Sequence, residues 1–441
     1  MDQKTIYAII GAIVIIAIVG IAAVAMMGGG KQQTPTITTV TQVSTVTQVS
    51  TTTVTQYAQQ PTATSTVAAT QTLTVTQTAT QPGLPSSCAG LSGQIIAGGA
   101  TFPGPQFDYW TKYLYNATGG RIKITYNYVG SGAGQTSLIK GEYAFAGSDL
   151  PLAPDRYNQY KGQIIQFPDI LGSELLVYNV PEIAYVKTHM RLNLTAEIIA
   201  GIYMGTIRYW DDPAIKAVNP GLASLLPHKE ITPVHRSDAS GTTGWFTLFL
   251  SKSVPRWNQT VGWGLSVNWP VDQMGVSKAG QGNPGVAQIV LNTPYSIGYV
   301  EYNYWITQKD KFDAVGGYAY LRNDNDGKFY DATPEAVSQA AAAGIQQVVQ
   351  RLGGFPSAAD NWWQVIQVFA NPPRGYPLVA FSFAMLRTDY SSYPNGQTVA
   401  AVVKCFWQYA LTTGQEQLVP GYLPLPKDIA QIGLNGLNLI K

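Results

Sequence analysis

The segment 235–243 brings together residue types that can bind an anion: an arginine, hydroxyl side chains and a glycine ahead of an apolar run with helical character. The N-terminus of a helix leaves backbone N–H groups unpaired and carries a partial positive charge, so it attracts anions. Ser240 or Thr242 can cap this helix, or can turn its hydroxyl onto a bound oxyanion. Asp238 can hold the guanidinium of Arg236 in place. The segment therefore predicts an anion site, with a capped helix and a surface ion pair as the alternative.

Three more polar loops follow runs that are predicted to be buried strands. The loops are 98–103, 130–134 and 147–149, after strand-like runs at 94–97, 122–128 and 142–146, with helical patterns at 105–115 and 135–140. Strands that alternate with helices predict parallel βαβ units, so the fold class is α/β. Ligands of such sheets bind beyond the carboxyl ends of the strands. We therefore expect the four polar loops to meet around one small oxyanion.

Asp149 narrows the kind of anion that this site can take. A carboxylate among anion-binding groups repels the ligand unless the ligand carries a proton to donate. Monohydrogen and dihydrogen phosphate carry such a proton near neutral pH, whereas sulfate carries none. The sequence therefore predicts inorganic phosphate as the ligand. Arsenate also carries a proton and remains an alternative of the same chemistry.

Catalytic and nucleic-acid-binding functions receive little support from the composition. The net charge is +2, without the basic excess that nucleic acid requires. No metal-site or P-loop motif is present, so we expect no metal and no cofactor. A phosphatase-like enzyme with Ser240 or Ser131 as nucleophile is the alternative, but His235, at the end of a strand, is interpreted as structural. We therefore predict a binding protein rather than an enzyme.

In order along the chain, these motifs resemble the phosphate-binding proteins that serve phosphate-specific ABC transporters of the PstS type. The resemblance covers roughly residues 94–430 and rests on the segments 99–103, 129–134, 145–149 and 236–242, and on family-like stretches at 166–168, 202–205, 210–215 and 297–302. Two departures are the opening of the first loop, Gly98-Gly99-Ala100, and Ala239 where the family commonly has glycine.

The resemblance implies a phosphate-binding set. The set is Thr101, Phe102, Ser131, Asp149 as acceptor of the phosphate proton, Arg236, Ser240, Gly241 and Thr242, with Asp238 pairing with the arginine. It also implies a two-lobed periplasmic-binding-protein-like (type II) fold with a hinge. Lobe I would take about 89–175 and 376–441, and lobe II about 176–375, with crossovers at 175–180 and 377–386. Closed around phosphate, the protein would deliver it to an ABC transporter permease.

The first 88 residues differ in composition from the rest. Between Lys4 and Lys31 the run 6–27 is almost wholly apolar and uncharged, long enough for a membrane span of about 20 residues. We favour a retained anchor over residues 1–30, although Ala23-Val24-Ala25 resembles a signal-peptidase site. Residues 31–88 repeat Thr-Val-Thr-Gln and predict an extended stalk, or a β-rich segment that pairs with copies of itself.

An anchored stalk predicts a single-pass N-terminal tether on the cell membrane, with the binding domain at 89–441 on the extracytoplasmic face. A cell-surface adhesin that reuses the scaffold would fit the stalk equally well. The two cysteines, Cys88 and Cys405, lie at opposite ends of the globular part. Outside the cytoplasm they can form a disulfide, and the alternative is two buried thiols.

Overall fold

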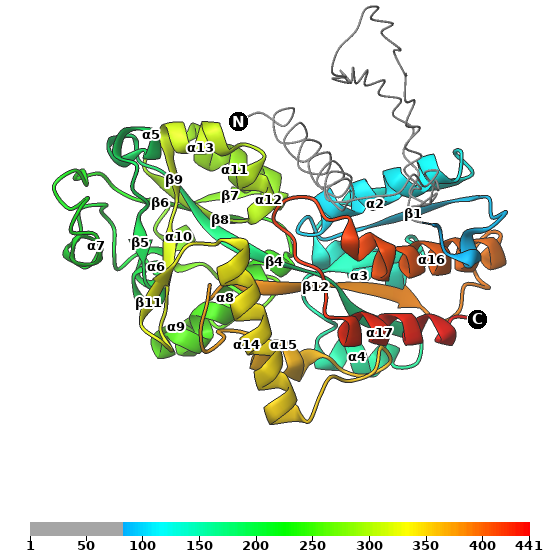
Figure 1. Ribbon diagram of the computed structural model, residues 1–441. Coiled ribbons are helices and arrows are strands. Elements are labelled where there is room, and N and C mark those ends of the chain that lie inside the picture. The colour runs from blue at the N-terminus through cyan, green and yellow to red at the C-terminus, as the bar shows by residue number, and fades with distance from the viewer. Residues whose placement is uncertain (1–82) are drawn as a thin grey trace, which may run out of the picture. The chain divides into compact units, whose positions relative to one another are not determined.

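Strand β4 (Ile164–Asn179) runs through the middle of the sheet, and all 16 of its residues are buried. Its first part pairs with β12 (Val379–Arg387), and its last part pairs with β8 (Ser296–Glu301) and β9 (Gly316–Tyr318). The computed structural model describes residues 83–441, and Figure 1 shows β4 passing from one half of this unit into the other. The strand order of the described sheet is β2-β1-β3-β12-β4-β8-β6-β7, with β9 on β4.

In the first half of the sheet, three parallel strands end at the same level. β1 (Gly93–Gly99) lies between β2 (Ile122–Tyr128) and β3 (Phe145–Ser148), and Gly99 pairs with both Tyr128 and Gly147. The loops after these strands therefore come together, as the alternation predicts. Each loop leads into a helix: α2 (Gly104–Ala117), α3 (Ser131–Ile139) or α4 (Pro154–Tyr160). Helices α16 (Gly396–Leu411) and α17 (Lys427–Gly436) complete this half.

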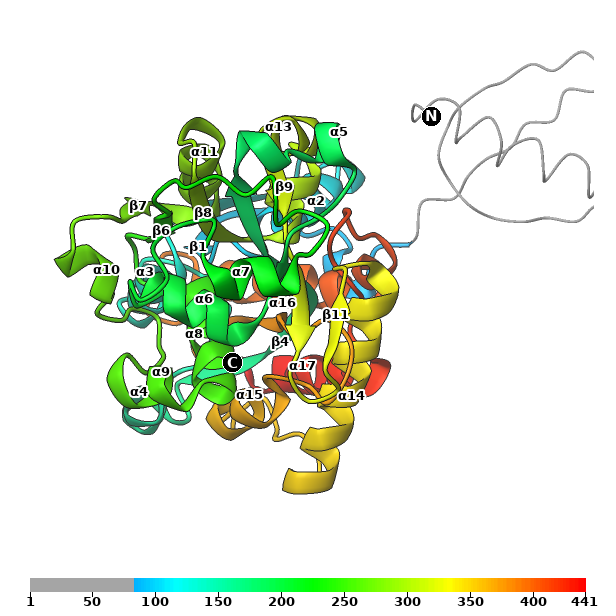
Figure 2. The same ribbon diagram turned by 90° about the vertical axis from the view of Figure 1, so that its left-hand side faces the viewer.

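The second half repeats this arrangement around β6 (Thr232–Arg236). β6 pairs in parallel with β8 and with β7 (Lys278–Gly280), so that Arg236 lies beside Gly280 at the strand ends. Helices α8 (Gly241–Ser253) and α11 (Gly282–Asn292) follow β6 and β7. Figure 2 looks onto this half, with α6 (Ala196–Tyr203) and α7 (Pro213–Val218) toward the viewer.

The remaining elements surround these two half-sheets. A small sheet has the order β11-β10-β5. Its strands are β5 (Asn193–Leu194), β10 (Tyr320–Asn323) and β11 (Lys328–Tyr330). The other helices are α5 (Tyr185–Thr188), α9 (Pro255–Thr260), α10 (Pro270–Gln273), α12 (Tyr302–Ile306), α13 (Lys309–Val315), α14 (Pro334–Leu352) and α15 (Trp363–Phe369), and the 3-10 turns are η1 (Ser86–Cys88), η2 (Pro181–Ile183), η3 (Thr413–Glu416) and η4 (Leu437–Leu439).

Several predicted boundaries shift. The expected helix at 105–115 is α2, and the expected strand at 122–128 is β2 with the same bounds. The segment 130–134 was expected to be a loop, but α3 already starts at Ser131, because Gly130 takes a φ of +86° and turns the chain directly into the helix. The third strand, expected at 142–146, lies at 145–148. The predicted α/β class is confirmed.

Among the described residues, Cys88 of η1 forms a disulfide with Cys405 of α16, 317 positions later in the chain. Within residues 83–441 no helix has both the length and the apolar character that a membrane span requires. The predicted anchor at 1–30 lies outside the described residues, and so does the predicted stalk up to residue 82.

Candidate functional site

The Ser131 hydroxyl joins three of the predicted loops at one atom. It lies at the first position of α3 and accepts hydrogen bonds from the backbone N–H of Asp149 at 3.2 Å and of Gly241 at 3.0 Å. Gly241 opens helix α8, and Ser240 caps this helix by accepting from the N–H of Thr243 at 3.2 Å. The ends of α3, β3 and α8 therefore converge, and the Ser240 hydroxyl serves its own helix.

Arg236 is held from two sides at the end of β6. Its Nε and Nη2 donate to the two carboxylate oxygens of Asp238 at 2.8 and 2.5 Å, and its Nη1 donates to the Thr242 hydroxyl at 3.2 Å. The guanidinium is buried, so this pairing offsets a charge that would be costly in isolation. Burial opposes ionisation of Asp238, but Arg236 and the Gly282 N–H outweigh it, and the pKa of Asp238 is lowered.

Asn283, which is not among the predicted site residues, also belongs to this cluster. Its Nδ2 donates to the hydroxyls of Thr101 at 3.0 Å and Thr242 at 3.3 Å, and its Oδ1 accepts from the N–H of Glu301 at 3.1 Å. It lies in the first turn of α11, directly after β7. The sequence does offer a signal for this residue, the glycine-containing run 280–283 between β7 and α11. This run is a strand-to-helix loop of the same kind as the other four, which indicates a place at the same site.

Thr101 and Phe102 lie in the loop between β1 and α2. The Thr101 hydroxyl accepts from the backbone N–H of Asn283 at 3.1 Å as well as from its side chain, so it links the two halves of the sheet. Phe102 has a fully buried ring, and its carbonyl accepts from the hydroxyl of Tyr422 at 2.6 Å.

Asp149 is the buried acid of the cluster whose carboxyl group is not fully hydrogen-bonded. Its side chain is 1% exposed, and its Oδ1 has no hydrogen-bond partner among the described atoms. Burial raises the pKa of Asp149 to about 8; the Arg236 charge opposes this rise and Asp238 adds to it. The carboxyl therefore carries a proton at neutral pH, and it can donate or accept one hydrogen bond depending on pH.

The nine predicted site residues thus form one cluster in loops that these hydrogen bonds bring together, and all of them except Asp238 are buried. The Thr101 and Thr242 hydroxyls, the guanidinium and the Asn283 amide bond to one another, and the Ser131 hydroxyl accepts from backbone N–H groups, so an anion that enters must replace some of these contacts. Charge-assisted hydrogen bonds to an anion are stronger than the neutral bonds they would replace. The cluster has the chemistry of a site for a small oxyanion.

Comparisons with known proteins agree with this chemistry. A family model described as a PBP superfamily domain matches residues 29–413. The phosphate-binding protein PstS of Methanocaldococcus jannaschii is 39% identical over 350 residues, which cover 78% of this chain and 85% of that protein. The PstS of Pasteurella multocida is 35% identical over 338 residues, covering 76% and 88%. The chain belongs to the PstS family of phosphate-binding proteins.

A solved structure shares the fold of this PstS-family chain. It is a high-affinity periplasmic phosphate-binding protein (PfluDING) bound with phosphate, with a TM-score of 0.57 and 20% identity, covering 79% of this chain and 99% of that one. The predicted α/β periplasmic-binding-protein fold is therefore confirmed. Membership of a family of binding proteins also confirms that the chain is not an enzyme.

His235, the residue that most invited a catalytic assignment, has a structural environment. It is buried, its ring stacks on Trp269 with a centroid distance of 4.9 Å, and its Nε2 lies 2.8 Å from a carboxylate oxygen of Asp272. Its ring is therefore engaged by Trp269 and Asp272.

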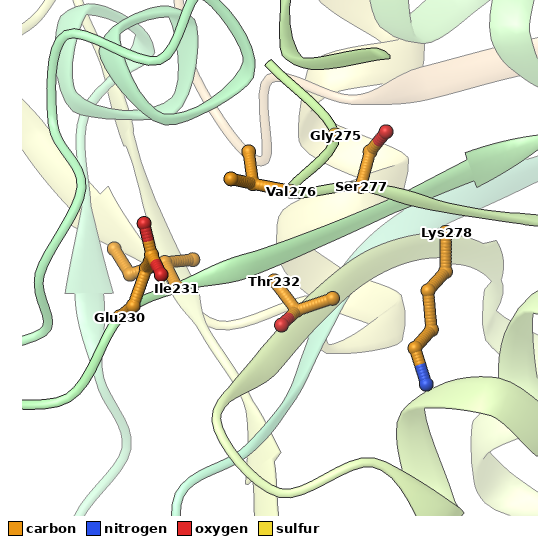
Figure 3. Close-up of a pocket in the computed structure, with 7 residues that line it drawn as sticks. All are labelled: Glu230, Ile231, Thr232, Gly275, Val276, Ser277 and Lys278. Carbon is orange, nitrogen blue, oxygen red and sulfur yellow. The ribbon is translucent and has the colours of Figure 1, made fainter.

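A surface hollow of about 280 Å³ lies at the other end of β6. Figure 3 shows Glu230 and Lys278 on opposite sides of this hollow, with Thr232 between them. Thr232 begins β6 and Arg236 ends it, so the hollow is separate from the anion site. Glu230 is already paired with Arg208.

Proposed function

We propose that this chain binds inorganic phosphate in the cluster around Arg236 and Asp149 and is the phosphate-binding component of a phosphate ABC transporter. The names of its PstS relatives support the ligand. The observation that carries the proposal is the buried Asp149 carboxyl, with a free oxygen, among donors from both half-sheets. In its ionised form such a group suits an anion that itself carries a proton.

Each residue of the cluster has a proposed role. Arg236 supplies positive charge, and Asp238 fixes its orientation. The Asp149 carboxylate accepts a hydrogen bond from the protonated oxygen of the ligand. Hydroxyl and amide donors complete the shell: Thr101, Phe102, Ser131, Ser240, Gly241 and Thr242, to which we add Asn283. Ser240 contributes through its position at the N-cap of α8, because its hydroxyl accepts from Thr243.

Phosphate would enter by a hinge motion between two lobes, at about 89–175 with 376–441 and at about 176–375. The sheet supports this division, since β4 pairs with β12 up to Ser173 and with β8 from Glu174 onward. Opening would break contacts that cross the boundary, such as Thr101 with Asn283 and Ser131 with Gly241. Closure would exclude water and strengthen each bond to the anion.

The closed form would pass phosphate to the permease subunits of the transporter. An N-terminal anchor at 1–30 and a stalk at 31–88 would keep the binding domain near them, on the extracytoplasmic face. A disulfide between Cys88 and Cys405 is consistent with an oxidising compartment.

Calorimetry of the full-length protein with phosphate, arsenate, sulfate and a phosphomonoester tests the proposal. At alkaline pH, where Asp149 is ionised, we expect one phosphate per chain, competition by arsenate, and much weaker binding of sulfate and of the ester. A protein that binds none of the four would support the adhesin alternative. Equal binding of phosphate and sulfate at alkaline pH would contradict the role of Asp149.

A further inference from the structure

Two carboxyl groups beside the anion site, Asp169 and Glu174, have no hydrogen-bond partner on either oxygen. Both are in β4, the strand that joins the two half-sheets, and both side chains are 0% exposed. An ionised carboxylate in such surroundings has lost its water. Beside Asp169 the Ser382 hydroxyl and the backbone N–H groups of residues 169 and 170 favour the charged form, but burial outweighs them, so the protonated form is favoured.

Asp169 comes close to Asp149 through an irregularity in the sheet. Ser382 of β12 pairs with Ile170 while Phe383 pairs with Pro168, so Asp169 is an extra residue in β4 at this point. On the other edge of β12, Phe383 pairs with Ser148, the residue before Asp149. Two buried carboxyl groups therefore lie on either side of β12.

Glu174 faces a second acid directly. In the antiparallel pair of β4 and β8, Glu174 is opposite Glu301, and both are fully buried. Directly opposed side chains of two strands lie close together on the same face, and like charges there repel. Glu301 has donors of its own, the N–H of Asn303 and the hydroxyl of Tyr422, whereas Glu174 has none.

Positive charge near these acids is scarce. The titratable groups that act on Asp169 or Glu174 are Asp149, Tyr126, Arg236, Glu301, Tyr299 and Tyr376. Within residues 83–441 Arg236 is the one cation of this group, and Asp238 already pairs with it. Burial, and then the nearby Asp149, raise the pKa of both Asp169 and Glu174 well above the ordinary range.

We propose that Asp169 and Glu174 keep protons next to the bound anion and are positioning residues that make anion capture depend on pH. The proposal rests on the proposed function, because it presumes that an anion occupies the cluster. Negative charge on the ligand disfavours ionisation of both acids, so at high pH binding requires them to regain protons. Affinity then falls as pH rises, by up to about tenfold per pH unit for each proton regained.

The variant Asp169→Asn/Glu174→Gln tests this, because the amides have nearly the shape of protonated acids and cannot ionise. The full-length protein is titrated with inorganic phosphate between about pH 6 and pH 9.5, a range that lies above the ordinary pKa of a carboxyl group. At the acid end we expect wild type and variant to agree within about threefold; at the alkaline end the variant should bind about tenfold or more tightly than wild type. Asp155→Asn, at an exposed carboxyl, should follow wild type.

Three results would overturn the proposal. The first is that phosphate affinity changes with pH to the same extent in wild type and variant. The second is that the variant loses affinity by the same factor at every pH, and the third is that it binds phosphate more tightly than wild type even at the acid end. If the variant does not fold, wild-type calorimetry in buffers of different ionisation enthalpy decides. The proposal requires a net uptake of protons when phosphate binds near pH 9, and no uptake would overturn it. Absence of phosphate binding by wild type at neutral pH would instead refute the proposed function.

Discussion

Arg236 and Asp238 form a two-point ion pair, with the Nε–Oδ1 and Nη2–Oδ2 distances at 2.8 and 2.5 Å. The pair neutralises the cation of the site and leaves Nη1 directed to Thr242. An anion bound here would not meet a large excess of positive charge. Selectivity must then come from the placement of hydrogen-bond donors and from the proton of Asp149.

Arg236→Lys should weaken phosphate binding by roughly ten- to a hundredfold. A lysine cannot form the two-point pair with Asp238 and reach Thr242 at once, and each charge-assisted bond contributes about 1.5–3 kcal/mol. Arg256→Lys is the matched control, because Arg256 makes an exposed pair with Glu197. Calorimetry at fixed pH measures both, and wild-type affinity in the Arg236 variant would mean that the main cation of the site is another residue.

The preference for phosphate over sulfate should increase with pH around the Asp149 pKa of about 8. Below that pKa the protonated carboxyl can donate a hydrogen bond to sulfate. Above it the carboxylate accepts only from a ligand with a proton, which monohydrogen phosphate still has. Competition titrations at several pH values measure the ratio. Asp149→Asn, a permanent donor, should give a low ratio that does not change with pH; a flat ratio in wild type would contradict the assignment.

The convergence of the polar loops could be predicted from the sequence because these loops follow a simple rule of parallel sheets. Loops at the carboxyl ends of β1, β2 and β3 meet because these strands end in register, as Gly99 with Gly147 illustrates, and the loops after β6 and β7 meet in the same way, as Arg236 with Gly280 illustrates. This rule needs only the alternation of strands and helices.

Features that depend on which strands pair with one another could not be predicted from the sequence. β12 is antiparallel between β3 and β4, and periodicity does not tell which strands a segment pairs with. The bulge at Asp169 follows from the pairing of β4 with β12, and the opposition of Glu174 to Glu301 follows from the pairing of β4 with β8. Asn283 was missed because β7 is only 3 residues long, too short for a recognisable pattern.

Gly241→Ala should reduce phosphate binding without unfolding the protein. A Cβ at this position would lie 2.5 Å from the Cβ of Asp149 and 2.7 Å from the Ser131 hydroxyl, so the loops must move apart. We expect a loss of affinity of about tenfold or more, since these loops carry the proposed donors. Gly264→Ala is the control, because its nearest contact would be 3.5 Å, to the carbonyl of Ser266. Equal affinities of the two variants would show that the loops tolerate the separation.

Asn283→Ala should weaken binding by roughly tenfold to a hundredfold. The change removes the donor to Thr101 and Thr242 and leaves the N–H of Glu301 without its acceptor, each costing about 1–3 kcal/mol. Asn292→Ala, at the exposed end of the same helix α11, should change neither affinity nor melting temperature. If Asn283→Ala lowers the melting temperature but leaves affinity intact, the residue has a structural role alone.

The disulfide between Cys88 and Cys405 should stabilise the domain without affecting the site. It closes a loop of 317 residues between η1 and α16, and loss of such a bond costs about 2–5 kcal/mol. Cys88→Ala/Cys405→Ala should therefore melt at a lower temperature than wild type yet keep its phosphate affinity, because neither cysteine contacts the anion cluster. A reductant should lower the melting temperature of wild type and leave the double variant unchanged. Insensitivity of wild type to the reductant would mean that the two thiols are not bonded in the native protein.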